Sequence, residues 1–274
     1  MATPVLRTER PSELSNPGLV LGYGNSPNGW KIAYALQALD EAHALPDGFT
    51  AVPLFLQKDE QFQPWFVEIN PNSKMPFLID NRRGKDPLYI FESGAILQYL
   101  ARVYDKNHLY TFEDDDLFQD MINWIHLAQA NLGPQQGQLN HFSRYTQVKC
   151  DYSHERFRTE VVRIYNVYDR HLATREYLVG DKLSYADFCT HPWLRVLFWA
   201  SVDIDEFPNV KAYCERIEAL PLIQRALKVP EQDLVTRVKA NPDFERELME
   251  RMKKAREEKE RERVEQVRQE EESK

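Results

Sequence analysis

The sequence predicts an α/β domain followed by an all-α domain, with a charged helical tail after them. Three observations support this prediction. The chain has 274 residues, 42% of them hydrophobic, which suits two domains with their own cores. Short apolar runs alternate with helical patterns over residues 18–104, whereas helical patterns prevail over 112–228. From Val229 onward apolar residues become sparse and charged residues dominate.

Composition narrows the class of protein. The net charge of −8 and the pI near 5.5 argue against a nucleic-acid partner, which would require a basic surface. No apolar run is of membrane length, so we expect no membrane partner. Residues 1–17 carry charges but no apolar centre, so we expect a flexible arm and not a secretory signal. The three widely spaced cysteines fit a cytoplasmic, reducing compartment and indicate no metal site.

The elements expected over residues 18–104 follow the order strand, helix, strand, helix, two strands, helix, which is typical of a thioredoxin-like domain. Strands are recognised by short β-branched or apolar runs, and helices by longer periodic ones. The expected elements are a strand at Leu19–Leu21, a helix at Trp30–Leu39, a strand at Phe49–Leu56, a helix at Pro64–Ile69, a hairpin of Phe77–Asp80 with Leu88–Ile90, and a helix at Ser93–Arg102.

The second domain, residues 112–228, is expected to be a helical bundle. Ser184 and Asp187 have the spacing of a capping box, which predicts a helix start. The other expected helices are Asp116–Asn131, Glu155–His171, Pro208–Ala219 and Leu222–Leu227. The extension 229–274 is expected to be a solvated charged helix. Its one apolar stripe, which would dock on the body or on a partner subunit, consists of Phe244, Leu248, Met249 and Met252.

The turn after the first strand is the candidate functional site. There Ser26-Pro27-Asn28-Gly29 leads directly into a helix, whose free N–H groups would face a ligand seated on the turn. Thioredoxin-type redox proteins place a Cys-x-x-Cys motif at this turn. Here Ser26 and Gly29 stand in the two cysteine positions, so a sulfur at this site must arrive on a ligand.

Five motifs in order resemble the soluble glutathione transferases, in particular the branch of the yeast nitrogen-regulator prion protein and the bacterial nu class. The resemblance extends from about Val20 to Leu227. The motifs are Ser26-Pro27-Asn28-Gly29, Ser73-Lys74-Met75-Pro76, Phe91-Glu92-Ser93-Gly94-Ala95-Ile96, the stretch from Leu132 to Phe142, and the stretch from Tyr177 to Asp187. Met75 departs from the Val or Ile usual in the family, the Asn/Gln-rich prion arm of the yeast protein is absent, and the tail after Val229 has no counterpart.

The resemblance implies that glutathione is the co-substrate and assigns roles to individual residues. Asn28 would stabilise the glutathione thiolate with assistance from Ser26, and Tyr23 ranks below both. The implied glutathione contacts are Gln61 and Lys74 at the glycyl end, the backbone of Met75 at the cysteinyl residue, Glu92 and Ser93 at the γ-glutamyl end, and Arg156 from a partner chain. A homodimer is implied as well, with Trp65 and Phe66 as interface anchors.

The second substrate remains open. Candidates for its wall in the helical domain are Asn123, Trp124, Gln138, Asn140, His141 and Arg156. The thiolate would attack an electrophilic small molecule, in detoxification or in secondary metabolism. An alternative is glutathione-dependent reduction of disulfides or peroxides. Another is a non-catalytic regulator or scaffold on the same fold.

Overall fold

The computed structural model describes residues 7–81, 86–241, 243–251, 253, 254, 257 and 261, apart from the side chain of Gln57. The chain forms two compact units, one up to Glu231 and the other from Gln232 onward. The first unit contains both predicted domains. The second contains most of the predicted charged extension.

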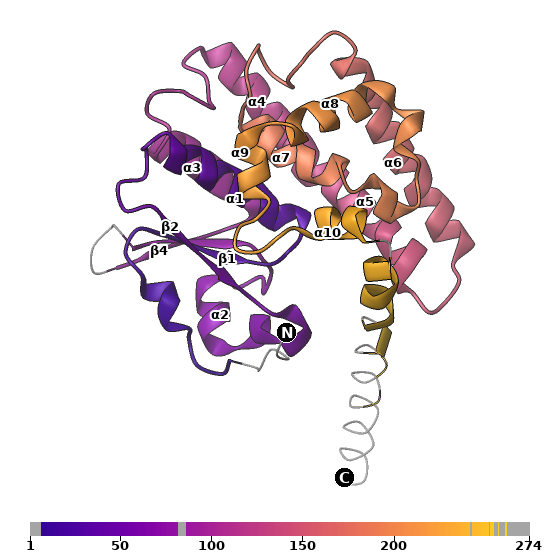
Figure 1. The fold of residues 1–274 in the computed structure, drawn as a ribbon, viewed down its shortest axis with the longest axis horizontal. Coiled ribbons are helices and arrows are strands. Elements are labelled where there is room, and N and C mark those ends of the chain that lie inside the picture. The colour runs from indigo at the N-terminus through magenta and orange to yellow at the C-terminus, as the bar shows by residue number, and fades with distance from the viewer. Residues whose placement is uncertain are drawn as a thin grey trace. The chain divides into compact units, whose positions relative to one another are not determined.

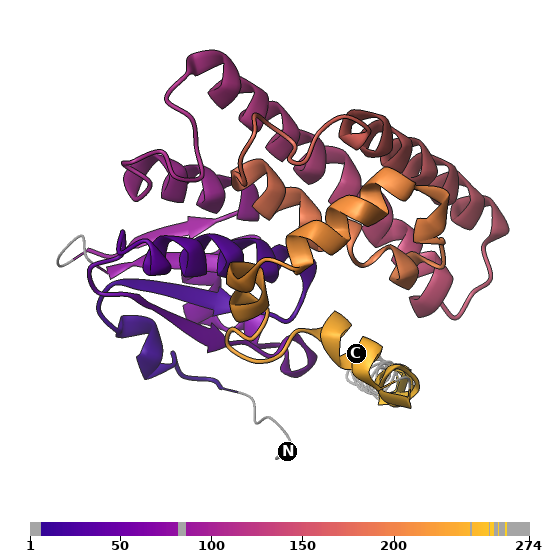
Figure 2. The ribbon, with the colours of Figure 1, turned by 45° about the horizontal axis from the view of Figure 1, so that its top comes forward.

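A four-stranded sheet in the order β2-β1-β3-β4 organises the first domain (Figure 1). Strand β1 pairs in parallel with β2 and antiparallel with β3, and β3 pairs antiparallel with β4. Helices α1 and α3 cover one face of the sheet and α2 the other (Figure 2). The elements are β1 (Leu19–Tyr23), α1 (Pro27–Glu41), β2 (Phe49–Pro53), α2 (Pro64–Ile69), β3 (Phe77–Asp80), β4 (Leu88–Phe91) and α3 (Ser93–Val103). The predicted thioredoxin-like fold is confirmed.

The core beneath the sheet includes both aromatic residues of α2. Phe66 is fully buried and stacks edge-on against Phe77 of β3, with ring centroids 5.2 Å apart. Trp65 is 7% exposed, and its indole N–H donates to the carbonyl oxygen of Arg7 at 3.2 Å. Both side chains therefore stabilise the domain itself, which contradicts their predicted role as dimer anchors.

Residues 7–17 pack against the first domain and do not form the expected flexible arm. Leu14 is fully buried in the same core, where burying one such side chain contributes about 1.5–3 kcal/mol. The Arg7 guanidinium donates to both carboxylate oxygens of Glu60, at 2.7 and 2.8 Å. The remainder of the expected arm, residues 1–6, lies outside the described residues.

The second domain is helical, as predicted. Its elements are α4 (Asp115–Leu127), a π-helical turn (Ala128–Leu132), α5 (Gly133–Asn140), a second π-helical turn (His141–Tyr145), α6 (Asp151–Leu172), α7 (Tyr185–Leu194), α8 (Pro208–Glu218) and α9 (Pro221–Ala226). The first expected helix is thus divided at Ala128. Pro134 lacks an N–H group, so the regular hydrogen-bond ladder cannot pass through it.

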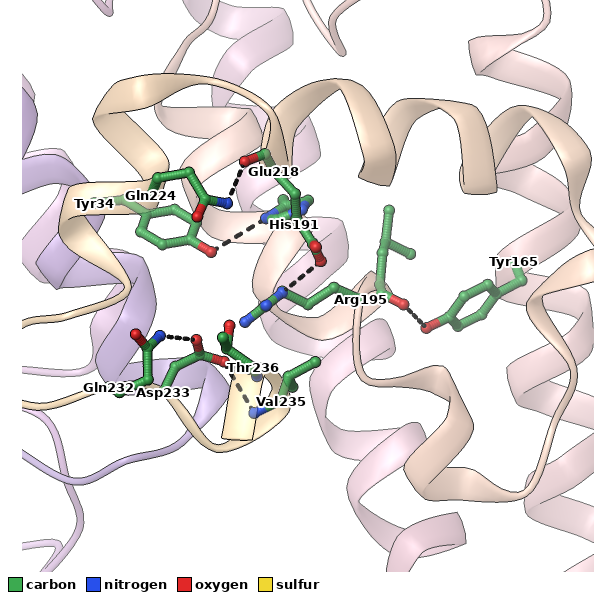
Figure 3. Close-up of polar contacts among 11 residues, drawn as sticks. Tyr34, Tyr165, His191, Arg195, Glu218, Gln224, Gln232, Asp233, Val235 and Thr236 are labelled. Atoms are coloured by element: carbon green, nitrogen blue, oxygen red, sulfur yellow. Dashed lines mark hydrogen bonds and ion pairs between the residues drawn. The ribbon is translucent and has the colours of Figure 1, made fainter. Parts of the chain in front are cut away.

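Helix α7 is the centre of this domain, and every one of its residues is buried. The predicted capping box at its start is confirmed, because the Asp187 carboxylate accepts from the Ser184 backbone N–H at 2.8 Å and the reciprocal bond is also present. Helix α7 also packs against α1 of the first domain. There the Tyr34 hydroxyl is hydrogen-bonded to His191 Nδ1 at 3.3 Å (Figure 3). The two domains therefore share a buried polar contact.

The second unit begins with α10 (Leu234–Ala240), capped by the Asp233 carboxylate, which accepts from the backbone N–H groups of Val235 and Thr236 (Figure 3). Residues 243–251 are also helical, and the Arg237 guanidinium lies 4.2 Å from the ring centroid of Phe244. Phe244, Leu248 and Met249 of the predicted apolar stripe are half-buried, whereas Met252 lies outside the described residues. Among the described helices, none is long and apolar enough to cross a membrane.

Candidate functional site

A cleft of about 280 Å³ lies where the two domains meet. Pockets for small ligands usually measure about 300–1,000 Å³, so the cleft suits a compact ligand. The first domain contributes Asn28, Lys31, Asn70, Asn72, Lys74, Met75, Pro76, Glu92 and Ser93, and the helical domain contributes Ala128, Gln129, Gly133, Pro134 and Trp193. Most of these side chains are polar, and nine of the fourteen residues come from the start of α1, the loop before β3 and the start of α3.

Asn28 enters the cleft from the first turn of α1, where free backbone N–H groups favour an anion. Ser26 is the N-cap residue of this helix. The Oδ1 atom of Asn28 accepts a hydrogen bond from the indole N–H of Trp193 at 3.0 Å. No acceptor among the described residues pairs with the Asn28 NH2 group. The amide therefore retains two donors at the edge of the cleft.

Lys31 follows one helical turn later and is 1% exposed. Its ammonium donates to Gln129 Oε1, and the Ser93 hydroxyl donates to the same oxygen at 3.3 Å. Burial lowers the pKa of Lys31, and the nearby Cys189 thiol and Glu92 carboxylate partly offset this effect. Gln129 thus links α1 to the start of α3 at the floor of the cleft.

The start of α3 provides a second set of free N–H groups. Ser93 is the first residue of this helix and is 4% exposed. The preceding Glu92 has a φ of 67°, a conformation that costs about 1–3 kcal/mol and is concentrated at ligand sites. Its carboxylate accepts from the Asn72 amide at 3.2 Å. The side chain of Gln129 packs closely on Gly94. A Cβ atom added at Gly94 would lie 2.9 Å from the Cγ atom of Gln129.

The loop before β3 forms the opposite wall. The Asn70 amide donates to the carbonyl oxygen of Lys74 at 2.7 Å and holds this loop in place. The Met75–Pro76 peptide bond is cis. The Met75 side chain covers Gly24, where an added Cβ would lie 2.5 Å from its terminal methyl group. Met75 also lines the cleft, with the exposed Lys74 beside it.

The structure brings five of the predicted site residues to the cleft, namely Asn28, Lys74, Met75, Glu92 and Ser93. The other three are absent from its described lining. Ser26 occupies the N-cap position of α1, makes no side-chain capping bond and is absent from the described lining. Gln61 is 8% exposed and donates to Asp59 Oδ1 at 3.4 Å. Arg156 is exposed on α6.

Tyr23 and the predicted wall residues of the helical domain are also absent from the described lining of the cleft. Tyr23, the lower-ranked alternative for the thiolate, is 1% exposed and packs against Gly29, away from the cleft. The described lining also contains none of the predicted wall residues Asn123, Trp124, Gln138, Asn140, His141 and Arg156. Trp124 instead packs against His171, with ring centroids 4.0 Å apart and the rings tilted by 41°. His141 is exposed.

Five residues with polar groups at the cleft were not predicted as site residues, namely Lys31, Asn70, Asn72, Gln129 and Trp193. Lys31 had a usable signal, since residues three apart in a helix share one face and Asn28 was already a candidate. Gln129 and Trp193 had none, because they lie 98 and 165 residues from the side chains that they contact in the first domain.

Comparison with known proteins agrees with this architecture. The family model for the glutathione S-transferase N-terminal domain matches residues 17–102, and that for the C-terminal domain matches residues 151–221, together more than half of the chain.

Individual relatives cover most of the chain. It is 32% identical over 209 residues to the disulfide-bond oxidoreductase YfcG of Escherichia coli, covering 76% of this chain and 93% of the relative. A glutathione transferase homolog from Lodderomyces elongisporus, crystallised with two glutathione molecules per subunit, superimposes with a TM-score of 0.72 at 32% identity, covering 78% of this chain and 99% of the homolog. The structure of Ure2p with glutathione superimposes with a TM-score of 0.69 at 30% identity, covering 77% of this chain and 99% of the Ure2p chain. The chain therefore belongs to the glutathione transferase family.

Proposed function

We propose that this protein binds glutathione in the cleft and stabilises its thiolate for reaction with a disulfide. Glutathione carries two carboxylates, an ammonium group and a thiol, so its site must supply donors, an acid and a group that favours the thiolate. The cleft offers all three kinds of group within one space. Solved relatives with glutathione or oxidised glutathione bound support this assignment.

The peptide part of glutathione is assigned to the walls of the cleft. The Ser93 hydroxyl and the free N–H groups of α3 would hold the γ-glutamyl carboxylate, and the Glu92 carboxylate would hold the ammonium. The backbone of Met75 would pair with the cysteinyl residue, and Lys74 would attract the glycyl carboxylate. Gln61 lies outside the lining, so its predicted contact is left out of the proposal. A contact from Arg156 requires a partner chain.

The observation that carries the proposal is the Asn28 amide at the N-terminus of α1, with its NH2 group at the cleft. A free thiol has a pKa near about 8.5 and is mostly protonated at neutral pH. Lowering that pKa by about two units requires roughly 2.7 kcal/mol of preferential interaction with the thiolate. A helix N-terminus and one aimed amide donor supply an interaction of this order.

Disulfide exchange is the reaction that the polar lining favours. In the first step, the glutathione sulfur attacks one sulfur of a disulfide, and the other sulfur leaves as a thiolate that takes up a proton. A second glutathione thiolate then attacks the mixed disulfide, which releases the second thiol and glutathione disulfide. Two glutathione thiols are oxidised and one disulfide is reduced to two thiols. The naming of relatives YfcG and YghU as disulfide-bond oxidoreductases supports this choice.

Conjugation to an electrophile is the second candidate, because it uses the same thiolate. The apolar groups Met75, Pro134 and Trp193 at the cleft would face its substrate. A regulatory role without catalysis is the third candidate, and one relative is named a transcriptional regulator.

The described cysteines are all free, which agrees with the expected cytoplasmic location.

Glutathione binding is tested by thermal unfolding. We expect glutathione at about 100 times its Kd to stabilise the protein by about 2.7 kcal/mol and to raise Tm by several degrees. Cysteinylglycine, which lacks the γ-glutamyl group, should give a much smaller shift. No shift with glutathione would contradict the proposed site and would favour a scaffold.

The reaction is tested by comparing activity on hydroxyethyl disulfide and on an aryl halide. The higher kcat/KM is expected on the disulfide, and the reverse result would favour conjugation.

A homodimer is the expected assembly, and Phe62 is the better candidate for its anchor. Phe62 is 64% exposed, with Leu56 and Val67 on the same stretch of chain at 43% and 40%. Exposed apolar side chains on one short segment are candidates for an association surface. We expect Phe62→Glu to convert the dimer into a monomer in light scattering at micromolar concentration. Tyr152→Glu, at a 77% exposed position on α6, is the matched control and should leave the dimer intact. A monomeric wild-type protein would contradict the prediction.

A further inference from the structure

The geometry points to Trp193 of the helical domain as the residue that positions the Asn28 amide for the glutathione sulfur. This inference rests on the proposed function and adds to it a residue with no assigned role. Trp193 belongs to α7, whereas Asn28 belongs to α1, 165 residues earlier in the chain. The two meet at the cleft, where both line the wall.

An asparagine amide can face a ligand in two ways. Its terminal torsion is broad and roughly two-fold, so the oxygen and the NH2 group exchange places at little intrinsic cost. Only the NH2 group stabilises a thiolate, because the amide oxygen would repel the negative sulfur. Some neighbouring group must therefore select one orientation.

The indole of Trp193 makes that selection. An indole N–H is a donor with no acceptor capacity, so it can pair only with the amide oxygen of Asn28. The distance from Trp193 Nε1 to Asn28 Oδ1 is 3.0 Å, a normal hydrogen bond. With the oxygen held in this way, the NH2 group remains available to a ligand.

Trp193 is itself held rigidly. Its side chain is 9% exposed and packs against two glycines of α5. A Cβ at Gly133 would lie 3.1 Å from the indole nitrogen, and one at Gly137 would lie 3.7 Å from the far edge of the ring. Its backbone carbonyl accepts from the Gln136 amide at 3.1 Å and from the Tyr165 hydroxyl at 3.2 Å. The segment 133–137 of α5, Gly-Pro-Gln-Gln-Gly, thus forms the surface against which the indole packs.

The consequence is that the helical domain controls the thiol chemistry of the first domain. If the Trp193 N–H is removed, the Asn28 amide loses the partner that fixes its orientation, and its donor faces the sulfur for only part of the time. The pKa of the bound thiol should then rise, whereas binding of the peptide part, at the walls formed by Glu92, Ser93 and Met75, should change little.

The test uses Trp193→Phe, which removes the N–H and keeps an aromatic ring. The pKa of bound glutathione is read from thiolate absorbance against pH, and Kd is measured for glutathione and for S-methylglutathione, which has no ionisable thiol. We expect the bound thiol pKa to rise by about one unit and kcat/KM on hydroxyethyl disulfide to fall about tenfold at pH 7. The loss should be smaller at pH 9. Kd for S-methylglutathione should stay within about twofold.

Trp199→Phe is the matched control, because Trp199 also donates its indole N–H, to the Tyr145 hydroxyl, but is absent from the described lining of the cleft. It should leave the bound thiol pKa unchanged. In an Asn28→Ala background, Trp193→Phe should cause no further rise in that pKa.

Three results would overturn the inference. The first is an unchanged thiol pKa in Trp193→Phe. The second is a loss of affinity for S-methylglutathione as large as the loss of activity, which would indicate a collapsed cleft. The third is an equal pKa rise in Trp199→Phe. Failure of the proposed function is recognised separately, since the wild-type protein would then neither bind glutathione nor lower its thiol pKa.

Discussion

Replacing Asn28 with alanine is expected to lower kcat/KM on the preferred substrate at pH 7 by at least about tenfold and to raise the pKa of the bound thiol. The amide NH2 is the side-chain donor that the structure leaves available at the N-terminus of α1. Without it, the thiolate keeps only the backbone N–H groups of the helix. The loss should shrink as the pH approaches the pKa of the free thiol, because the thiolate then forms without assistance.

Two variants serve as controls for this prediction. Ser26→Ala should change the activity little, because the Ser26 side chain makes no capping bond to α1 and is absent from the described lining of the cleft. Tyr23→Phe should behave in the same way, since Tyr23 is 1% exposed. If Asn28→Ala retains full activity on both the disulfide and the aryl halide, the role assigned to Asn28 is wrong. A large loss in Tyr23→Phe would transfer that role to the tyrosine.

Replacing Asp187 with alanine is expected to destabilise the protein by about 3–5 kcal/mol at pH 7. Its fully buried carboxylate accepts from the backbone N–H groups of Leu178 and Ser184 and from the hydroxyl of Tyr213, at 3.0, 2.8 and 2.9 Å. Removing it leaves these buried donors without their acceptor. The free energy of unfolding is measured by urea denaturation.

A control on an exposed cap separates this effect from ordinary helix capping. Asp114 caps α4 and accepts from the Leu117 backbone N–H at 2.9 Å. Asp114→Ala should cost only about 1 kcal/mol, because water replaces the lost bond. Equal losses in the two variants would contradict the importance assigned to the buried network.

The same carboxylate makes stability depend on pH. Burial, which outweighs the hydrogen bonds, raises the pKa of Asp187 from 3.8 to about 6. The folded state therefore binds more protons than the unfolded state between these two values. The stabilisation from this group is complete below pH 3.8, falls as the pH rises toward 6 and changes little above it. Asp187→Asn should remove this component of the pH profile. An unchanged difference between pH 4 and pH 7 would contradict the assignment.

Local patterns were sufficient for most of the fold. The predicted bounds of the helix Pro64–Ile69 and the strand Phe77–Asp80 are confirmed, because proline, asparagine and a run of apolar residues mark their ends in the sequence itself. The capping box at Ser184 is confirmed for the same reason. Helix α5 was not predicted, since two glycines and a proline lower its intrinsic helix propensity and tertiary packing compensates for them.

Predictions of which side chains are buried and which are exposed were less accurate. Trp65 and Phe66 were expected at a dimer surface, yet they fill the core, while Phe62 is the exposed aromatic residue of that segment. A short helix packed on one face of a sheet has too few residues for periodicity to show which of its own faces is covered. The same limitation applies to residues 7–17, where Leu14 is an isolated apolar residue that only the folded domain surrounds.

The two-domain architecture and the loops that form the site could be predicted from the sequence, because the turns before α1, β3 and α3 consist of consecutive residues with characteristic local chemistry. Which side chains complete the cleft depends on how the two domains pack. Gln129 and Trp193 reach it through contacts across 98 and 165 residues, and separations of that length leave no periodic or motif signal. The orientation of the Asn28 amide, on which the proposed chemistry depends, is for this reason a property of the packed domains.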